Sequence, residues 1–252
     1  MSKSPIDVAR VKADFPELGQ SIDGQPIVYL DSANSTMKPQ SVIDAMSTFM
    51  SSAYAPINRS SYRLAAQATD AYEAARSRVA GFINAPDAHG VIFTKNATES
   101  LNLVVHSWGR ANLRAGDAVV LTHMEHHANI VPWHMLAAER GIELRWLPLT
   151  ADGQLDLDAL PALLHGAKAF AFTAMSNVLG TITPVRTLTD AAHAAGAIAI
   201  VDGCQYVPHN ITDVTAMGAD LFAFTAAKVS NKLYESGLAR IEAEILLVNP
   251  VK

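Results

Sequence analysis

Short apolar runs rich in Val, Ile and Phe alternate along most of this chain with longer segments of helical period. Such alternation is typical of strand–helix–strand units, and it predicts an α/β fold with a mostly parallel sheet flanked by helices. The predicted strands are Ile27–Leu30, Val91–Thr94, Ala118–Leu121, Leu144–Leu147, Ala169–Ala174, Ala197–Val201 and Leu221–Phe224. The predicted helices are approximately Gln40–Ser52, Ala65–Ile83, Thr98–Trp108, Ile130–Ala138, Leu157–Leu164 and Leu188–Ala195.

No repeat, low-complexity segment or Gly/Ser-rich linker divides the chain, so we predict one domain over 27–252 after an N-terminal lead-in over 1–26. Half of the 252 residues are hydrophobic and 17% are charged, which argues against a disordered protein. The formal net charge is −5, so we expect no basic surface for nucleic acid.

The N-terminal segment contains no apolar run of the kind that a signal peptide needs. No later stretch approaches the roughly 20 consecutive apolar residues of a membrane-spanning helix. Cys204 is the single cysteine, which excludes an internal disulfide and a cysteine-based metal cage. We therefore expect a cytoplasmic protein that does not enter a membrane.

Polar residues that follow predicted strands are the candidates for chemistry, because ligands of an open α/β sheet bind beyond the carboxyl ends of its strands. The turn Lys95–Glu99 opens a predicted helix, and its N–H groups together with the Thr98 hydroxyl suit a phosphate. An ordinary helix N-cap is the alternative. The chain has neither a Gly-rich dinucleotide fingerprint nor a P-loop, so we expect no dinucleotide or P-loop nucleotide.

The densest cluster of ionisable residues follows the predicted strand Ala118–Leu121 and contains His123, Glu125, His126 and His127. It allows three interpretations: a metal site, one imidazole stacked on a planar cofactor, or histidines that cap a helix start. The spacing matches no zincin motif and adjacent histidines point apart, so we predict no metal site.

Two further charged residues follow buried strands. Asp202 ends an apolar strand, where a carboxylate is costly to bury unless it meets a cation or a donor. Capping of the following turn is the structural alternative for this residue. Lys228 comes a few residues after the last predicted strand, where a desolvated amine becomes nucleophilic. A phosphate-suited helix start, an imidazole, a carboxylate and a lysine together match the needs of pyridoxal 5'-phosphate.

Five motifs occur in the order that is typical of one enzyme family. They are Phe15–Leu18, Tyr29–Ala33, Met124–Trp133, Ser176–Gly180 and Val201–Gln205. On these motifs the chain resembles the class V, fold-type I enzymes that use pyridoxal 5'-phosphate, and most closely the SufS-type cysteine desulfurases. The resemblance runs from about Phe15 to about Lys228, and it implies a fold-type I PLP-dependent transferase large domain.

The resemblance implies roles for the matching residues. Lys228 would form the internal aldimine, Asp202 would pair with the pyridinium nitrogen, and His126 would stack over the ring and help to move protons. Thr98 and the helix start around Ala97 would hold the phosphate.

Further roles follow from the same resemblance. Gln205 would hydrogen-bond the phenolic oxygen of the cofactor, and Asn177 would contact the substrate carboxylate or the cofactor edge. Thr225 stands where the family has a phosphate-binding serine, and its hydroxyl can replace that of serine.

The sequence also departs from the family pattern. Ala227 stands in place of a histidine and cannot replace its imidazole. Lys232-Leu233-Tyr234 resembles a family tripeptide as well, which makes Lys232 a rival for the cofactor-binding lysine. The spacing from Asp220 through the last predicted strand favours Lys228.

The family's small C-terminal domain carries the persulfide-forming cysteine and the arginine that binds the substrate carboxylate, and we expect no counterpart before Lys252. We interpret Cys204 as a buried packing thiol, because it lies beside Asp202 where the family has a small residue.

The resemblance implies a cysteine desulfurase-like protein of iron–sulfur cluster assembly, which removes sulfur from L-cysteine and leaves alanine and a persulfide. It also implies a homodimer and a sulfur-acceptor protein as partner. The alternatives are another class V enzyme, such as a selenocysteine lyase or an epimerase, and a catalytically inactive dimerisation module of the same fold.

Overall fold

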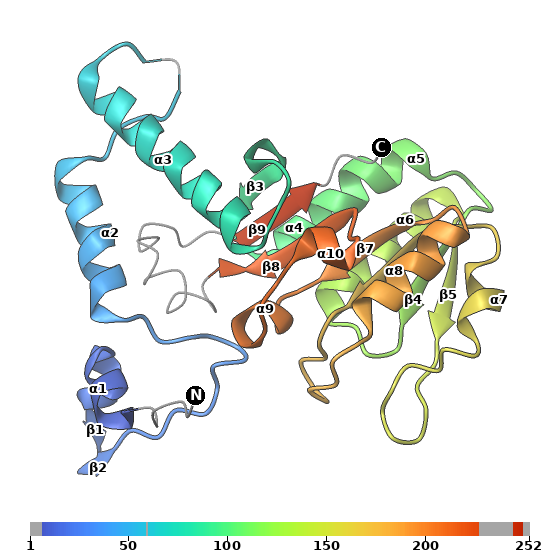
Figure 1. The fold of residues 1–252 in the computed structure, drawn as a ribbon, viewed down its shortest axis with the longest axis horizontal. Coiled ribbons are helices and arrows are strands. Elements are labelled where there is room, and N and C mark those ends of the chain that lie inside the picture. The colour runs from blue at the N-terminus through green and yellow to red at the C-terminus, as the bar shows by residue number, and fades with distance from the viewer. Residues whose placement is uncertain (1–6, 59, 227–243, 249–252) are drawn as a thin grey trace. The chain divides into compact units, whose positions relative to one another are not determined.

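The computed structural model describes residues 7–58, 60–226 and 244–248. These residues belong to two compact units, one that extends to Arg78 and one that begins at Val79 and contains the main sheet (Figure 1). The segment 227–243 lies outside the described residues, so the proposed lysines Lys228 and Lys232 do too.

The first unit consists of short helical turns, a two-stranded antiparallel hairpin and long helices. In chain order these are α1 Val8–Ala13, η1 Pro16–Gly19, β1 Ser21–Ile22, β2 Gln25–Pro26, α2 Gln40–Ser52 and the greater part of α3 Arg63–Phe82. The prediction of a strand over Ile27–Leu30 is wrong, because Val28 and Leu30 are 80% and 92% exposed and no described strand pairs with them. Apolar alternation forms a strand only where a neighbour accepts its backbone hydrogen bonds.

The second unit is built on a seven-stranded sheet in the order β3-β9-β8-β7-β6-β4-β5. Its strands are β3 Val91–Thr94, β4 Ala118–Thr122, β5 Glu143–Leu147, β6 Ala167–Thr173, β7 Ile198–Asp202, β8 Leu221–Thr225 and β9 Glu244–Val248. Strands β4 to β8 are mutually parallel, and β9 pairs antiparallel with both β3 and β8. The predicted mostly parallel sheet is therefore confirmed, with β9 as a strand that we did not predict.

Helices cover both faces of this sheet (Figure 1). The crossover from β4 to β5 runs in one direction along the sheet. The crossovers from β5 to β6, from β6 to β7 and from β7 to β8 run in the opposite direction. Right-handed crossovers place the two sets on opposite faces. The helices of this unit are α4 Ala97–Val104, α5 Arg110–Asn112, α6 Val131–Arg140, α7 Leu160–Leu164, α8 Val185–Ala194, α9 Tyr206–His209 and α10 Val214–Met217, with a π-helical turn η3 Val105–Gly109 and the 3-10 turns η2 Ala88–Gly90 and η4 His127–Asn129.

The core alternates along the strands. Ala169 and Ala171 of β6 belong to a buried cluster with residues of α4 and α6. Phe170 and Phe172 point to the other face, where their ring centroids lie 4.7 Å apart. A strand buried on both faces is apolar at every position, which explains why the apolar runs located these strands within about two residues.

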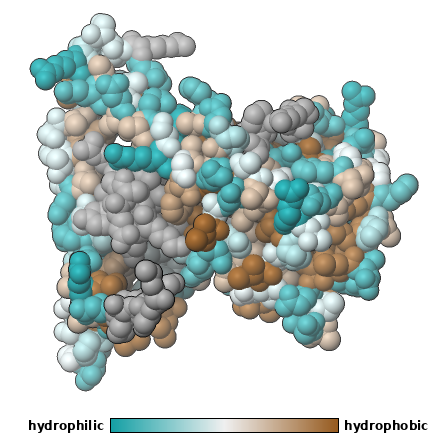
Figure 2. All heavy atoms as spheres, viewed as in Figure 1, coloured by the Kyte–Doolittle hydropathy of each residue, from teal (hydrophilic) through white to brown (hydrophobic). Residues whose placement is uncertain are grey.

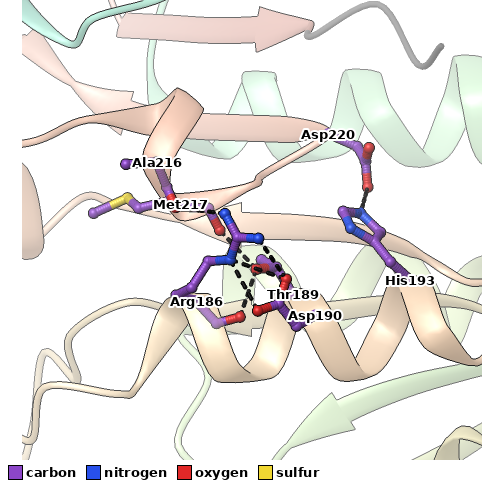
Figure 3. A network of polar contacts seen from close by, with 7 residues as sticks. All are labelled: Arg186, Thr189, Asp190, His193, Ala216, Met217 and Asp220. Carbon is purple, nitrogen blue, oxygen red and sulfur yellow. Dashed lines mark hydrogen bonds and ion pairs between the residues drawn. The ribbon is translucent and has the colours of Figure 1, made fainter.

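Helix α8 is fastened to its face of the sheet by polar contacts (Figure 3). The Thr189 hydroxyl is buried and donates to Met217 O at 2.6 Å. Arg186 pairs with Asp190 at 2.9 Å, and His193 Nε2 lies 2.8 Å from Asp220 Oδ2. These contacts join α8 to α10 and to the start of β8, at the edge of the sheet opposite to the predicted site.

On the face that Figure 2 shows, hydrophilic residues are interspersed with hydrophobic patches, as is usual for the surface of a folded protein. None of the helices in the described part of the chain combines the length and the apolar composition of a membrane span.

Candidate functional site

Six strands, β3 to β8, end at the same edge of the sheet, since β5 is parallel to β4. Strands β4, β6, β7 and β8 are parallel, and β3 has the same direction because β3 and β8 are both antiparallel to β9. Every described residue to which the sequence assigned a role lies at the end of one of these strands or in the segment that follows it. The topology therefore collects the predicted residues at the edge where ligands of such sheets bind.

Asp202 is the last residue of β7 and is only 4% exposed. Its Oδ1 accepts a hydrogen bond from Cys204 N at 2.9 Å. Its Oδ2 has no hydrogen-bond partner among residues 7–58, 60–226 and 244–248. A buried carboxylate with a vacant oxygen is suited to bind a cationic N–H group, because such a group offsets the cost of burial.

Gly203 brings the chain after Asp202 close to β8. Its N–H donates to Ala223 O at 2.8 Å, and an added Cβ would lie 2.2 Å from Cζ of the fully buried Phe222. The absence of a side chain at this position therefore lets the loop that carries Asp202 lie against the neighbouring strand.

We expect Gly203→Ala to lower the free energy of unfolding by about 1–3 kcal/mol, because the ring of Phe222 cannot move aside without disturbing the core. Urea denaturation followed by circular dichroism measures this change. Gly81→Ala is the control, since Gly81 lies in α3 with nothing within 4 Å of the added carbon, and alanine there should be neutral or stabilising. Equal stability of the Gly203 variant and the wild type would contradict the expectation.

Thr225 and Gln205 lie beside Asp202 in the same part of the site. Both are 9% exposed. The Thr225 hydroxyl donates to Cys204 Sγ at 3.6 Å. Cys204 is half-buried and in contact with a hydroxyl, which corrects the interpretation of a fully buried packing thiol. The loop after β7 and the end of β8 are thus joined through this sulfur.

His126 lies in the loop after β4 and is the N-cap of η4. Its Nδ1 accepts a hydrogen bond from Ala128 N at 3.1 Å, and its ring is otherwise exposed. Because Nδ1 is an acceptor, the neutral ring carries its proton on Nε2. The histidine therefore caps a turn, as one of the three interpretations proposed, and still presents Nε2–H to its surroundings.

Glu125 is a residue to which the sequence assigned no role, and it is buried beside His126. Its Oε1 accepts from Thr122 Oγ1 at 2.5 Å and from Thr173 N at 2.9 Å, and its Oε2 accepts from Asn129 Nδ2 at 2.7 Å. Burial raises its pKa to about 8, the three donors oppose that rise, and the negative charge of Asp202 adds to it. The sequence placed Glu125 in the cluster of ionisable residues after Ala118–Leu121, and nothing in that local pattern indicated that it would be buried.

Helix α4 begins with Asn96 as its N-cap, and Glu99 of its first turn accepts from the residue before the cap. Asn96 Oδ1 accepts from Glu99 N at 2.7 Å, and Glu99 Oε2 accepts from Lys95 N at 2.5 Å. The ordinary N-cap is therefore present, but it belongs to Asn96. It leaves the N–H groups of Ala97 and Thr98 without an acceptor in the described part of the chain, which keeps them available for an anion.

Asn177 is exposed in the loop Ser176–Gly180 after β6. This loop is held by Ser176 Oγ, which accepts from Val178 N at 3.3 Å and from Leu179 N at 3.1 Å. The side chain of Asn177 is thus presented to solvent at the same edge of the sheet. In the described residues we find no group of three or more His, Cys, Asp or Glu residues arranged to hold a metal ion.

Comparison with known proteins agrees with this geometry. The family model described as Aminotransferase class-V matches residues 28–231. Cysteine desulfurases of Yersinia pestis (strain Pestoides F) and Pectobacterium carotovorum subsp. carotovorum (strain PC1) are each 48% identical over 223 residues. The match covers 88% of this chain and 55% of each relative, so the chain spans about half the length of the curated relatives it matches.

Solved structures show the same likeness. The apo structure of a cysteine desulfurase from Thermococcus onnurineus NA1 superposes with a TM-score of 0.86 at 32% identity, over 99% of this chain and 58% of that one. The cysteine desulfurase CsdA (S-sulfonic acid) from Escherichia coli gives a TM-score of 0.81 at 34% identity, over 97% and 58% of the two chains. These similarities confirm the predicted fold class.

Proposed function

Because this chain belongs to the class-V aminotransferase family, whose members depend on pyridoxal 5'-phosphate, we propose that it is a cysteine desulfurase-like protein acting on L-cysteine. The observation that carries this proposal is Asp202, a buried carboxylate at the ligand-binding edge of the sheet, one oxygen of which has no hydrogen-bond partner among the residues that the structure describes. The curated relatives and solved structures that carry the name cysteine desulfurase support the choice of reaction.

The donors and acceptors at this edge fit pyridoxal 5'-phosphate. The vacant Asp202 oxygen suits the pyridinium nitrogen, and the Thr225 hydroxyl with the N–H groups of Ala97 and Thr98 suits the phosphate. Gln205 would donate to the phenolic oxygen. When bound, the cofactor supplies an electron sink for the amino group and α-carbon of the substrate.

Residues of the chain would orient the cofactor, transfer protons and bind the substrate. Asp202 would orient the ring and would favour the protonated ring nitrogen, because a negative charge in a desolvated site stabilises the cationic form. His126 presents Nε2–H at the end of β4, where it would cover the ring face and donate or accept a proton. Lys228 would bind the cofactor covalently, and Asn177 would contact the substrate carboxylate.

The overall reaction transfers one sulfur atom. L-cysteine and an acceptor thiol would give L-alanine and the acceptor persulfide, so that the carbon–sulfur bond breaks and a sulfur–sulfur bond forms. The acceptor would be a thiol of a partner protein. We further propose a homodimer in the cytoplasm, with 27–252 as the cofactor-binding large domain, which is supported by the family match over residues 28–231.

The test measures cofactor binding and alanine formation separately. The chain is mixed with pyridoxal 5'-phosphate, its visible absorbance is recorded, and alanine is then measured with L-cysteine and dithiothreitol as acceptor. We expect a bound-cofactor spectrum and alanine formation well above that of free cofactor. A bound cofactor without alanine above the free-cofactor rate would contradict the proposed reaction. A spectral change with other amino acids but not with cysteine would favour another reaction of the family.

A further inference from the structure

Glu125 is a buried carboxyl group in this site that the proposed reaction does not use. It lies at the centre of a hydrogen-bonded network with Thr122, Asn129, Trp133 and Thr173, whose members are all at most 9% exposed. We propose that Glu125 is a positioning residue that fixes the location and orientation of the His126 ring relative to the Asp202 carboxylate. As a role in cofactor binding, this inference rests on the proposed function.

The network contains residues that precede and follow His126 in the sequence. Glu125 precedes this histidine and Asn129 follows it, and the two side chains are joined by the 2.7 Å contact of Nδ2 with Oε2. Asn129 is itself held by Trp133, whose Nε1 donates to Asn129 Oδ1 at 3.3 Å. The turn that presents the imidazole is therefore closed by a buried contact beneath it.

The same carboxyl group reaches the strand beside Asp202. Glu125 Oε1 accepts from Thr173 N, the backbone of the last residue of β6. Thr173 pairs in register with Asp202, and the next residue, Ala174, donates its N–H to Asp202 O at 2.8 Å. One side chain thus links the histidine loop after β4, through β6, to the residue that would bind the ring nitrogen.

The direction of each hydrogen bond defines what this position requires. Trp133 Nε1 can only donate, so Asn129 presents Oδ1 to Trp133 and Nδ2 to Glu125. Thr173 N is a donor, and Thr122 Oγ1 accepts from Met124 N, which leaves its own hydrogen for Glu125. All three neighbours therefore donate, and only an ionised carboxylate, the form that Glu125 takes above its raised pKa of about 8, offers acceptors on both oxygens.

This requirement allows a test by exchange of donor and acceptor. Glu125→Gln places an amide NH2 against a donor, and Asn129→Asp places a second carboxyl group against the first. In the double variant the new amide can donate to the new carboxyl group, whose other oxygen still accepts from Trp133. Complementarity is lost in each single variant and restored in the double variant.

The first readout uses the chain without cofactor at about pH 9, above the raised pKa of about 8, so that Glu125 is ionised in the wild type. Nitrogen-15 NMR of His126, assigned with His126→Gln, reports the tautomer of the ring. We expect the Nε2–H form in the wild type and in the double variant, and a mixture in Glu125→Gln. The second readout is the dissociation constant of pyridoxal 5'-phosphate, which we expect to rise about ten-fold in Glu125→Gln and to recover in the double variant.

Glu139→Gln is the control, because Glu139 is an exposed glutamate of α6, and it should alter neither readout. If Glu125→Gln does not fold, Thr122→Val removes one donor with little change of shape and should shift both readouts in the same direction. An unchanged His126 tautomer in a folded Glu125 variant would overturn the positioning role. Failure of the wild type to bind the cofactor would instead overturn the proposed function, since the NMR readout does not depend on it.

Discussion

Asp202→Asn is expected to lower the rate of alanine formation from L-cysteine by about 100-fold or more and to weaken binding of pyridoxal 5'-phosphate. Asparagine has nearly the same shape, so Cys204 N can still donate to the side-chain oxygen, and the fold should persist. The substitution removes the negative charge that would stabilise a protonated ring nitrogen in a buried site. Steady-state kinetics and equilibrium binding of the cofactor measure the two effects.

Asp220→Asn is the matched control for this substitution. Asp220 also lies next to a buried strand and accepts from Ala199 N at 2.7 Å, but it precedes β8 and so lies at the opposite edge of the sheet. We expect a modest loss of stability and unchanged cofactor binding. Undiminished activity of Asp202→Asn, with Asp220→Asn equally active, would show that Asp202 does not bind the ring nitrogen.

Lys228→Ala is expected to abolish covalent attachment of the cofactor and to reduce alanine formation by about 10⁴-fold or more. Loss of the amine removes the only group that we propose to bind the aldehyde, whereas the carboxylate and phosphate contacts are unaffected. Non-covalent cofactor binding should therefore persist. Reduction with borohydride followed by mass spectrometry measures attachment, because it makes the link between amine and aldehyde permanent.

Lys232→Ala provides the comparison, since Lys232 is the rival for the same role. We expect this variant to retain the cofactor mass on Lys228 and most of the activity. The opposite pattern, with attachment lost only in Lys232→Ala, would assign the role to Lys232. Attachment that survives in both single variants would show that neither lysine is required alone.

The sheet illustrates how far the apolar runs determine a fold. Six of the seven predicted strands are present, and four of them, β4, β6, β7 and β8, are buried on both faces and so consist almost entirely of consecutive apolar residues. Ile27–Leu30 has the same pattern but forms no strand, since no described strand pairs with it. Strand β9 was not predicted, although it pairs with β3 and β8. Pairing is a property of distant segments, and a local pattern does not contain it.

The start of α4 is a part of the site that local sequence patterns could predict. The sequence Lys95–Glu99 predicted a helix start suited to a phosphate, with an N-cap as the alternative. The structure shows the N-cap, in which Asn96 accepts from Glu99 N, and in the described part of the chain the N–H groups of Ala97 and Thr98 have no acceptor. A capping pair is a local interaction between residues three apart, so it was within reach of the sequence.

The environment of Glu125 depends on contacts between segments that are distant in the sequence. The sequence by itself determined the order of strands and helices and the residues that follow each strand, because burial and helical period act over a few neighbouring residues. Only the tertiary structure decided that Glu125 is buried and accepts from Thr173, which lies 48 positions away in the sequence. Hydrogen bonds between adjacent parallel strands depend on which strands lie side by side, and that arrangement exists only in the folded chain.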